Sequence, residues 1–384
     1  MAFSFDKPSL LQRVAPIFRG FDGLLFVAIL LLAGIGLVTM YSVGFDHGTR
    51  FTDHSRNMLL AAGVMFLVAQ VPPQRLMTLA LPAYLLGVVL LFGVEFVGIE
   101  RKGSQRWLDV GIVIQPSELL KIAMPMMLAW WFQRREGQLG TLDFGMALLL
   151  VAVPAALIIH QPDLGTALLV VASGLFVIFF AGLSWKIIIP PVLLGAIGIV
   201  VLIVMEPSWC APDVDWRILH EYQRQRVCTL LDPFKDPLGK GFHIIQGMIA
   251  IGSGGVWGKG FMQGTQTHLE FIPERTTDFI FAAFSEEFGL LGVIGLMMAL
   301  LFLVTRGLMI ALNAPTLFTR LLAGAVTLNI FIYAFVNMGM VSGILPVVGV
   351  PLPFVSYGGT AMITMGVGLG MLMSIARSKR LMPS

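Results

Sequence analysis

Long apolar runs separated by short polar segments dominate the chain. Ten of these runs are long enough, or nearly so, to be helices that cross a lipid bilayer, which takes about 20 residues. They cover residues 22–43, 57–71, 76–98, 117–133, 143–160, 164–182, 185–206, 278–304, 318–342 and 359–377. The pattern predicts an all-α, polytopic membrane protein with ten transmembrane helices, which form one domain over residues 1–384.

Composition leads to the same fold class. Of the 384 residues, 57% are hydrophobic and 12% are charged, whereas a soluble domain is about half apolar and about a quarter charged. The net charge is only +3, and the basic residues are spread among short loops, so a nucleic-acid partner is not indicated. Residues 1–20 have no short apolar core followed by a small-residue cleavage site, so we interpret them as a cytoplasmic tail.

The distribution of Lys and Arg predicts the orientation. Twelve of the 25 Lys and Arg residues fall on the same side of the membrane as the N-terminus, and five lie in the short loops on the opposite side. Because basic loops stay in the cytoplasm, we expect both termini to be cytoplasmic and one long loop, about residues 207–277, to be extracytoplasmic. Cys210 and Cys228 lie in that loop, and their spacing alone leaves open whether they are bridged or are two free thiols.

Several predicted spans contain ionisable residues. Glu118 and Lys121 are three residues apart, so they share a helix face and can pair. Glu286 and Glu287 lie two turns into the eighth span, and Glu286 shares a face with Asp278. Such residues usually face a cavity or a partner. The alternatives are an ion pair that only joins two helices and neutral acids that only pack.

Glycine and proline mark further features. Residues 337–359 are apolar but contain three prolines, so they cannot form one regular helix. Irregular backbone at membrane depth must be covered by protein or line a wet cavity, and we expect this segment to border a groove.

Gly366 and Gly370 predict close helix packing. Residues 252–260 lack the strand context and spacing of a phosphate loop, and we interpret them as a flexible hinge.

Carboxylates and cations gather on the side that carries the long loop. Guanidinium groups bind phosphate oxygens through two hydrogen bonds, and a carboxylate can deprotonate a hydroxyl. Asp163 and Asp278 each precede a helix, so either can instead be only an N-cap acid, and Glu270 can be only a solvated loop acid. The candidate site residues are Arg101, Arg106, Glu118, Lys121, Asp163, Arg224, Arg226, Glu270 and Asp278.

Motifs along nearly the whole chain make it similar to a known family. They are Arg106-Trp107, Gln115–Lys121, Gln161–Thr166, Tyr222–Val227, Asp232–Gly239, His243–Gln246, Ala250–Gly255, Gly264–Gln266, Pro273–Phe281, Leu345–Pro353 and Ser356–Gly359. With these motifs the chain resembles the SEDS family (shape, elongation, division and sporulation), and its RodA branch more than FtsW. One departure is Thr276, where the family motif has His.

The resemblance implies ten transmembrane helices and a peptidoglycan glycosyltransferase of the bacterial inner membrane. Such an enzyme polymerises lipid II, a disaccharide-pentapeptide on undecaprenyl pyrophosphate, for cell elongation and rod shape. The resemblance implies Asp278 as the catalytic acid residue and Glu118, Lys121, Asp163 and Glu270 as sensitive neighbours. It also implies a class B penicillin-binding protein as partner within the elongation machinery, a divalent cation (Mg²⁺ or Mn²⁺), and no organic cofactor.

Two other functions fit part of the sequence. A lipid II flippase would use Glu118, Lys121, Glu286 and Glu287 as a path through the membrane. A scaffold for a penicillin-binding protein would need no reactive acid at Asp278. The flippase needs ionisable groups across the whole membrane, but here they are crowded into the outer half. This distribution favours an enzyme that works at the outer face.

Overall fold

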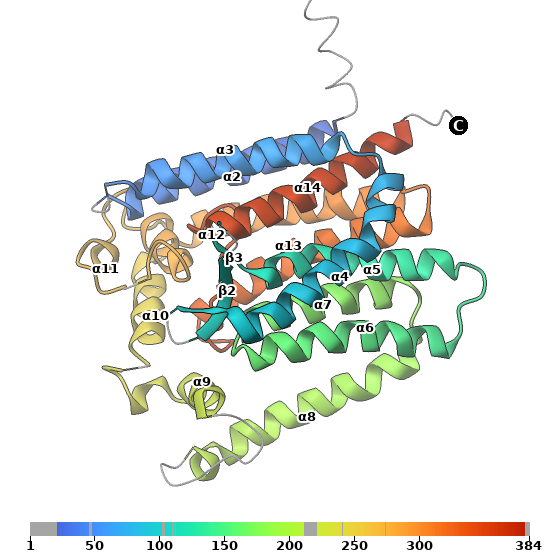
Figure 1. The fold of residues 1–384 in the computed structure, drawn as a ribbon. Coiled ribbons are helices and arrows are strands. Elements are labelled where there is room, and N and C mark those ends of the chain that lie inside the picture. The colour runs from blue at the N-terminus through green and yellow to red at the C-terminus, as the bar shows by residue number, and fades with distance from the viewer. Residues whose placement is uncertain are drawn as a thin grey trace, which may run out of the picture.

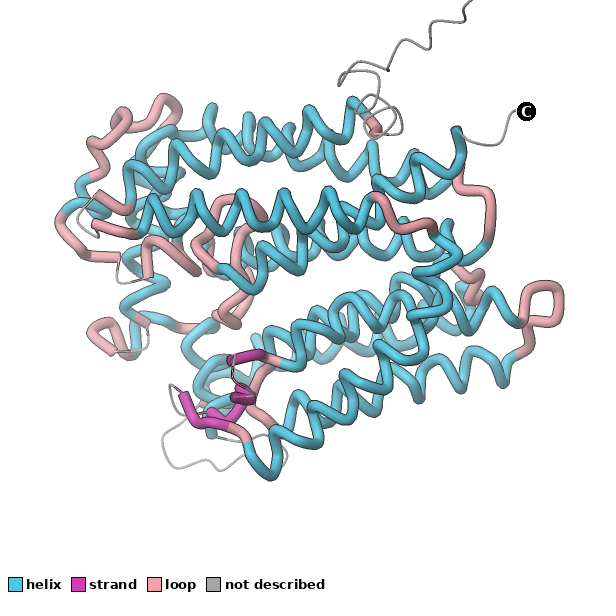
Figure 2. The backbone as a smooth tube through the Cα atoms, turned by 45° about the horizontal axis from the view of Figure 1, so that its top comes forward, coloured by secondary structure: helices cyan, strands magenta, loops and turns pink. Residues whose placement is uncertain are grey.

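A computed structural model describes residues 21–45, 48–101, 104–109, 111, 113–210, 221–239, 241–272 and 274–380. These residues form a bundle of long helices that run in nearly the same direction or its reverse (Figure 1). The connecting segments gather at the two ends of the bundle (Figure 2). The start of α2 (Gly23–Val43) and the end of α14 (Gly359–Arg380) lie at one end, and α10 (Phe242–Gly254) and α11 (Thr265–His268) lie at the other (Figure 1).

All ten predicted spans are helical. The helices are α2 (Gly23–Val43), α3 (Arg50–Ala69), α4 (Pro73–Val97), α5 (Pro116–Arg134), α6 (Thr141–His160), α7 (Leu164–Phe180), α8 (Trp185–Trp209), α12 (Ile280–Leu312), α13 (Leu317–Val341) and α14 (Gly359–Arg380). Within the part of the chain that the structure describes, seven of them are long and apolar enough to cross a membrane. The other three are α3, α5 and α7, of which α7 has only 17 residues. A helical, multi-pass membrane protein is therefore confirmed, whereas the number of spans stays a prediction.

The loop before α5 contains a small sheet that the sequence analysis missed. Its strands are β1 (Ile99–Arg101), β2 (Ser104–Asp109) and β3 (Val113–Ile114), which pair antiparallel in that order. The strands are too short to show a clear alternation of polar and apolar residues. The sheet leads into α5, which starts with Pro116 at its first helical position, where the missing N–H costs no hydrogen bond.

The described part of the predicted long loop includes several helical segments. It contains α9 (Glu221–Leu231), the 3₁₀ helix η1 (Pro233–Lys235), α10 (Phe242–Gly254) and α11 (Thr265–His268). Helix α10 packs against α12 and α13. A disulfide joins Cys210, which ends α8, to Cys228 on α9. The structure thereby decides the question that the spacing of the two cysteines left open.

Helix α12 is broken at Gly289, whose φ of 61° is outside the helical range. The peptide groups freed by such a break need partners, because no water reaches them in an apolar interior. The loop that follows α10 supplies them. In this loop the Lys259 N–H donates to the Glu286 carbonyl at 3.0 Å, and the Gly255 carbonyl accepts from the Leu290 N–H at 2.9 Å. The flexible hinge that we expected here is therefore wrong, since this loop is bonded along the break.

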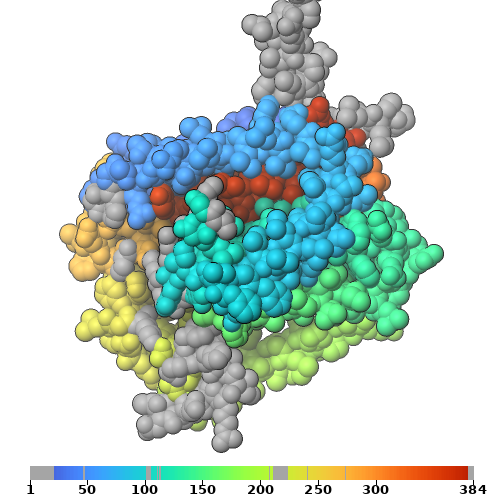
Figure 3. Space-filling model, viewed as in Figure 1, coloured from blue at the N-terminus to red at the C-terminus, as the bar shows by residue number. Residues whose placement is uncertain are grey.

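Helices α5 and α13 lie inside the bundle, and two-thirds of the apolar stretch of α13 is buried. Helix α14 lies between α3 and α4 (Figure 3). It packs tightly on α3, because a Cβ at Gly366 would lie only 2.5 Å from the Ala61 carbonyl oxygen and one at Gly370 only 2.6 Å from that of Met65. The close packing expected from these two glycines is confirmed.

Helix α8 stands apart from the rest of the bundle (Figure 1). None of its apolar stretch, Trp185–Glu206, is buried inside the protein. Two links near its end connect it to the following segment. One is the Cys210–Cys228 disulfide, and the other is the ion pair between Glu206 and Lys235. The connection of this helix to the remainder is thus concentrated at the end that faces α9 and η1.

Candidate active site

A polar cavity of about 380 Å³ opens where β2, α5, α7 and α9 meet the segment after α13. We call it the polar cavity. Its charged and amide-bearing lining residues are Arg106, Gln115, Glu118, Lys121, Asp163, Arg226 and Asp278. Residues 347–351 complete the wall, so the Pro-broken segment borders the cavity as predicted. Elements far apart in the sequence therefore bring three acids and three bases together.

Asp163 both caps a helix and holds neighbouring side chains. It is the N-cap of α7, where its Oδ1 accepts from the Thr166 N–H at 3.1 Å. Its Oδ2 accepts from Gln115 Nε2 at 3.0 Å, and Arg106 Nη1 lies 3.6 Å from Oδ1. Arg106 also donates to the carbonyl of Pro162 at 2.6 Å. The capping interpretation of Asp163 is confirmed, and the same carboxylate positions Arg106 at the cavity.

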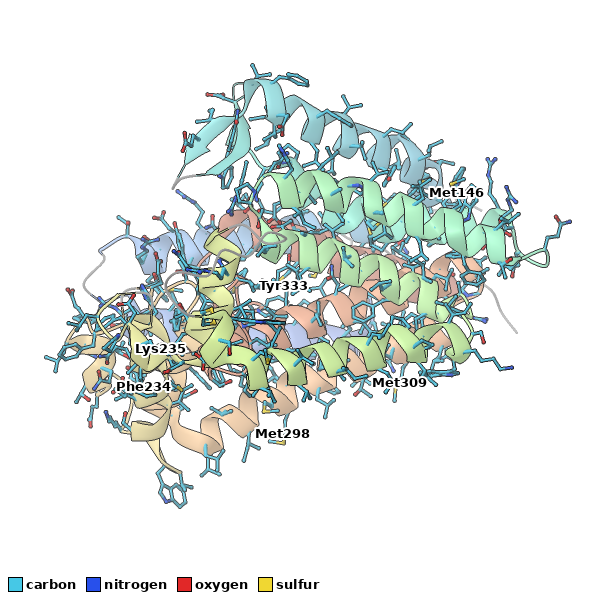
Figure 4. All side chains as sticks on the ribbon, turned by 90° about the horizontal axis from the view of Figure 1, so that it is seen from below. Met146, Phe234, Lys235, Met298, Met309 and Tyr333 are labelled. Carbon is cyan, nitrogen blue, oxygen red and sulfur yellow. A yellow bond between two sulfur atoms is a disulfide. The ribbon has the colours of Figure 1, made fainter. Side chains whose placement is uncertain are left out.

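Glu118 and Lys121 form a close ion pair in the first two turns of α5. Their Oε1 and Nζ atoms are 2.6 Å apart, and only 4% of the Lys121 side chain and 15% of the Glu118 side chain are exposed. The second carboxylate oxygen of Glu118 accepts from the Thr364 hydroxyl at 3.1 Å. Lys121 Nζ also lies 5.3 Å from the ring centre of Tyr333, which is inside the bundle (Figure 4). The pair is thus buried, and three helices contribute to it.

One side chain holds the backbone of Asp278 next to the cavity wall. The amide of Asn337, inside α13, donates to the Asp278 carbonyl at 2.9 Å and to the Val350 carbonyl at 2.7 Å. Helix α12 begins at Ile280 with Phe279 as its N-cap, so Asp278 is not the N-cap residue and that alternative is wrong. Its carboxylate lines the polar cavity, where it can accept a proton.

Comparison with known proteins then identifies the family. The family profile described as "Cell cycle protein" (FtsW/RodA/SpoVE) matches residues 22–381. The chain belongs to the FtsW/RodA/SpoVE family. It is 46% identical to the peptidoglycan glycosyltransferase MrdB of Escherichia coli (strain K12) over 360 residues, which are 94% of each chain. It is 36% identical to the stage V sporulation protein E of Bacillus subtilis (strain 168), with 94% of this chain and 98% of that protein covered.

Two solved structures have the same fold as this FtsW/RodA/SpoVE member. One comes from work described as "Structural coordination of polymerization and crosslinking by a peptidoglycan synthase complex". It matches with a TM-score of 0.76 and 32% identity over 94% of this chain and 98% of that chain. The other is the crystal structure of the rod shape determining protein RodA of Thermus thermophilus, with a TM-score of 0.66 and 26% identity over 94% and 97% of the chains.

Of the remaining predicted site residues with a described side chain, Arg224 and Glu270 do not line the polar cavity, whereas Arg226 does. Arg226 lines the cavity and donates to the Val347 carbonyl at 2.9 Å. Arg224 is on α9 but does not line the cavity, and Arg101 ends β1 with a side chain outside the described part. The Glu270 side chain is 68% exposed, 3.7 Å from the guanidinium of Arg275. A role for Glu270 in the reaction stays a prediction, and its place is in the loop before α12.

Glu286 and Glu287 hold the structure next to the break in α12. Glu286 is fully buried and accepts from Lys259 Nζ at 2.6 Å and from the Gln266 N–H at 2.8 Å. Glu287 accepts from the Ser42 hydroxyl at 2.6 Å. Neither lines the polar cavity. They anchor the loop that carries α11 and do not join Glu118 and Lys121 in one path.

Several uncharged polar residues around the site were missed as candidates, including Gln115, which bonds Asp163. Asn337 and Thr364 lie in predicted spans and bond Asp278 and Glu118, as described above. The Ser356 hydroxyl donates to the carbonyl of Thr277 at 2.7 Å, next to Asp278. A buried amide such as Asn337 inside an apolar run is itself a signal, because an unpaired amide costs free energy in lipid. Its partner, however, is visible only in three dimensions.

The residues of the polar cavity do not fit a metal held by the protein. Within the described ranges, no group of three or more His, Cys, Asp or Glu side chains lies close enough to hold an ion. Glu118 is paired with Lys121 and Asp163 with Arg106, so two of the three acids already face a cation. We therefore assign no chemical step to an ion bound by protein ligands.

Proposed function

We propose that Asp278 is the general base with which this peptidoglycan glycosyltransferase polymerises lipid II in the polar cavity. The observation that carries the proposal is that Asp278 lines the same cavity as three cations, Arg106, Lys121 and Arg226. A base must meet the hydroxyl that it deprotonates, and pyrophosphate needs cations nearby. Both kinds of group line this cavity.

The reaction follows from these positions. The Asp278 carboxylate takes the proton of an acceptor sugar hydroxyl while that oxygen attacks the anomeric carbon of the donor. The bond from this carbon to the pyrophosphate oxygen breaks, and undecaprenyl pyrophosphate leaves with the electron pair. Lys121, Arg106 and Arg226 stabilise the charge that develops there. Because pyrophosphate leaves as a stable anion, no second carboxylic acid is required, unlike in glycoside hydrolysis.

The acids next to the cations position them. Glu118 holds Lys121, and Asp163 holds Arg106. Fixed cations stabilise a developing charge better than mobile ones, since they need no reorganisation during the reaction. A divalent cation, Mg²⁺ or Mn²⁺, would in this proposal arrive on the substrate pyrophosphate, and it enters no step above.

The experiment is incubation of the purified protein with lipid II, followed by electrophoresis of the products. We expect glycan strands from the wild type without any other glycosyltransferase. A flippase would instead move lipid II across vesicle membranes without polymer, and a scaffold would do neither. Absence of polymer from a folded preparation, with the class B penicillin-binding protein that we propose as partner present, would refute the function.

The partner and the membrane belong to the same proposal. A similar solved structure comes from a complex that coordinates polymerisation and crosslinking. We infer that a class B penicillin-binding protein crosslinks the strands that this chain makes, as part of the elongation machinery. The polymerase would then lie in the bacterial inner membrane with ten spans and its polar cavity outside.

The topology can be tested by thiol labelling. The two native cysteines form a disulfide, so single Cys substitutions can be labelled without a native free thiol. Arg50→Cys and Gln263→Cys should react with a membrane-impermeant maleimide in spheroplasts and stay protected in sealed inverted vesicles. Arg50 begins α3, and Gln263 is an exposed residue two positions before α11. The start of α3 and helix α11 lie at the end of the bundle opposite to the end of α14 (Figure 1). Labelling of Gln263→Cys only in inverted vesicles would reverse the orientation.

A further inference from the structure

A second cavity, of about 550 Å³, adjoins the polar cavity. We call it the adjoining cavity. Its lining residues are Gln225, Arg226, Thr229, Asp236, Gly239, His243, Ile244 and Val347. Arg226 and Val347 line both cavities, and Arg226 donates to the Val347 carbonyl at 2.9 Å. The two cavities thus share one wall, which is made of this hydrogen-bonded pair. The proposed reaction uses the polar cavity and leaves the adjoining cavity without a role.

The lining of the adjoining cavity suits a ligand with many hydroxyl groups. It presents an amide, a hydroxyl, a carboxylate and an imidazole together with the apolar side chains of Ile244 and Val347. Sugars need hydrogen-bonding groups for their hydroxyls and apolar contacts for their C–H faces. The volume lies within the range of about 300–1,000 Å³ that is usual for ligand sites. A chain of sugar rings therefore fits the cavity in both chemistry and size.

His243 gives a separate indication of a ligand. Its Nδ1 atom is buried and has no hydrogen-bond partner in the part of the chain that the structure describes. Buried polar atoms are nearly always hydrogen-bonded, and an exception calls for an unseen partner. The imidazole ring lines the adjoining cavity, and a rotation of the ring can bring this atom to a hydroxyl or amide of a bound molecule.

The adjoining cavity lies close to Asp278. The ring of His243 lies 5.8 Å from that of Phe279, the residue after Asp278. Cys228, bridged to Cys210, sits next to Thr229 on α9. The ion pair from Lys235 to Glu206 fixes η1, and Figure 4 shows Lys235 at this end of the molecule. The disulfide and the ion pair thus join α9 and η1 to α8, and the bond from Arg226 to Val347 joins α9 to the wall of the polar cavity.

We propose that the adjoining cavity is a saccharide subsite, which holds sugar units of the glycan strand beyond the disaccharide that reacts. The inference rests on the proposed polymerase function. Coupling of two lipid II molecules involves only one disaccharide from each, so the first coupling does not use the subsite. Every later addition does, because the strand then extends past the reacting disaccharide. Contacts in this cavity would therefore favour elongation over the start of new strands.

The test uses two variants that remove hydrogen-bonding groups and keep the shape of the cavity. Thr229→Val removes a hydroxyl, and His243→Phe keeps a ring against Phe279. With lipid II as substrate, the first coupling should stay within about twofold of the wild type, while each later addition slows by about three- to tenfold, as expected for one lost hydrogen bond. The product strands should then be shorter on a gel that resolves single disaccharide steps.

Ser253→Ala is the matched control. Ser253 lies on α10 like His243, but its hydroxyl donates to the Ala250 carbonyl at 2.9 Å, and it lines neither cavity. It should leave both the first coupling and the strand length unchanged. If Thr229→Val and His243→Phe make strands of wild-type length, there is no subsite. If they slow the first coupling as much as the later additions, their effect is on folding or on the reaction, and the inference is overturned.

A binding measurement separates this inference from the proposed function. The probe is a soluble tetrasaccharide of alternating N-acetylglucosamine and N-acetylmuramic acid, which carries no pyrophosphate. Wild type and Asp278→Asn should bind it equally, and Thr229→Val and His243→Phe about three- to tenfold more weakly. If the wild type makes no polymer, the proposed function fails, and this measurement alone decides the subsite. Equal binding by all four proteins would refute the subsite, even in an active polymerase.

Discussion

Asp278→Asn should lower the rate of glycan polymerisation by about 10²–10⁴-fold, the usual contribution of a general base. The substitution keeps the size of the side chain and removes only its basicity. The backbone bond from Asn337 to the Asp278 carbonyl does not involve the side chain, so the fold should persist. The measurement is the initial rate of polymer formation from lipid II, together with the melting temperature and the affinity for lipid II.

The control for this prediction is Asp143→Asn. Asp143 is a buried acid with a guanidinium partner, but it lies near Arg135 at the other end of α6 from the cavity. Its replacement should lower stability without a comparable loss of rate per folded molecule. Polymerisation by Asp278→Asn at the wild-type rate, in a preparation without other glycosyltransferases, would exclude Asp278 as the base.

Lys121→Met should destabilise the protein by about 3–5 kcal/mol, the cost of leaving one partner of a buried ion pair without the other. The remaining Glu118 carboxylate would stay almost buried and would keep only the Thr364 hydroxyl as a donor. The double variant Glu118→Gln/Lys121→Met removes both charges and should be clearly more stable than the single one. The stability of both variants can be measured by thermal unfolding in detergent.

Activity should respond differently from stability. The single and the double variant both lack the cation next to the pyrophosphate, so both should polymerise slowly, although only the single variant loses much stability. This separation distinguishes a cation that acts on the substrate from a pair that only joins α5 to α13 and α14. Melting of both variants at the wild-type temperature would show that the pair is not buried in the folded protein.

Much of the fold could be predicted because lipid limits the choices. A backbone in a bilayer must satisfy its hydrogen bonds internally, so long apolar runs become helices, and the ten runs did so. The ends of α7 and α13 agree with the prediction within about two residues, the usual uncertainty of helix ends. The predicted eighth span ended at residue 304, but α12 continues to Leu312, and this additional part of the helix contains Arg306, which forms an ion pair with Asp22.

The candidate site was partly predictable for a different reason. Charged residues are costly in lipid, so Glu118, Lys121 and Asp278 stood out in apolar surroundings. The sequence could not show that Arg226 would reach the polar cavity or that Glu270 would lie outside it. Loop residues carry no periodic signal, and their positions depend on the elements to which the loop docks.

By itself, the sequence determined a helical membrane protein with a cluster of acids and bases at one end, since these features depend on local hydrophobicity and on the cost of charge in lipid. Only the tertiary structure decided which residues and segments contact one another. It packed the supposed flexible loop after α10 along the break at Gly289, and it paired Asn337 with the backbone of Asp278. Such pairings join residues tens of positions apart, and they form because each buried polar group must find a partner, whichever segment supplies it.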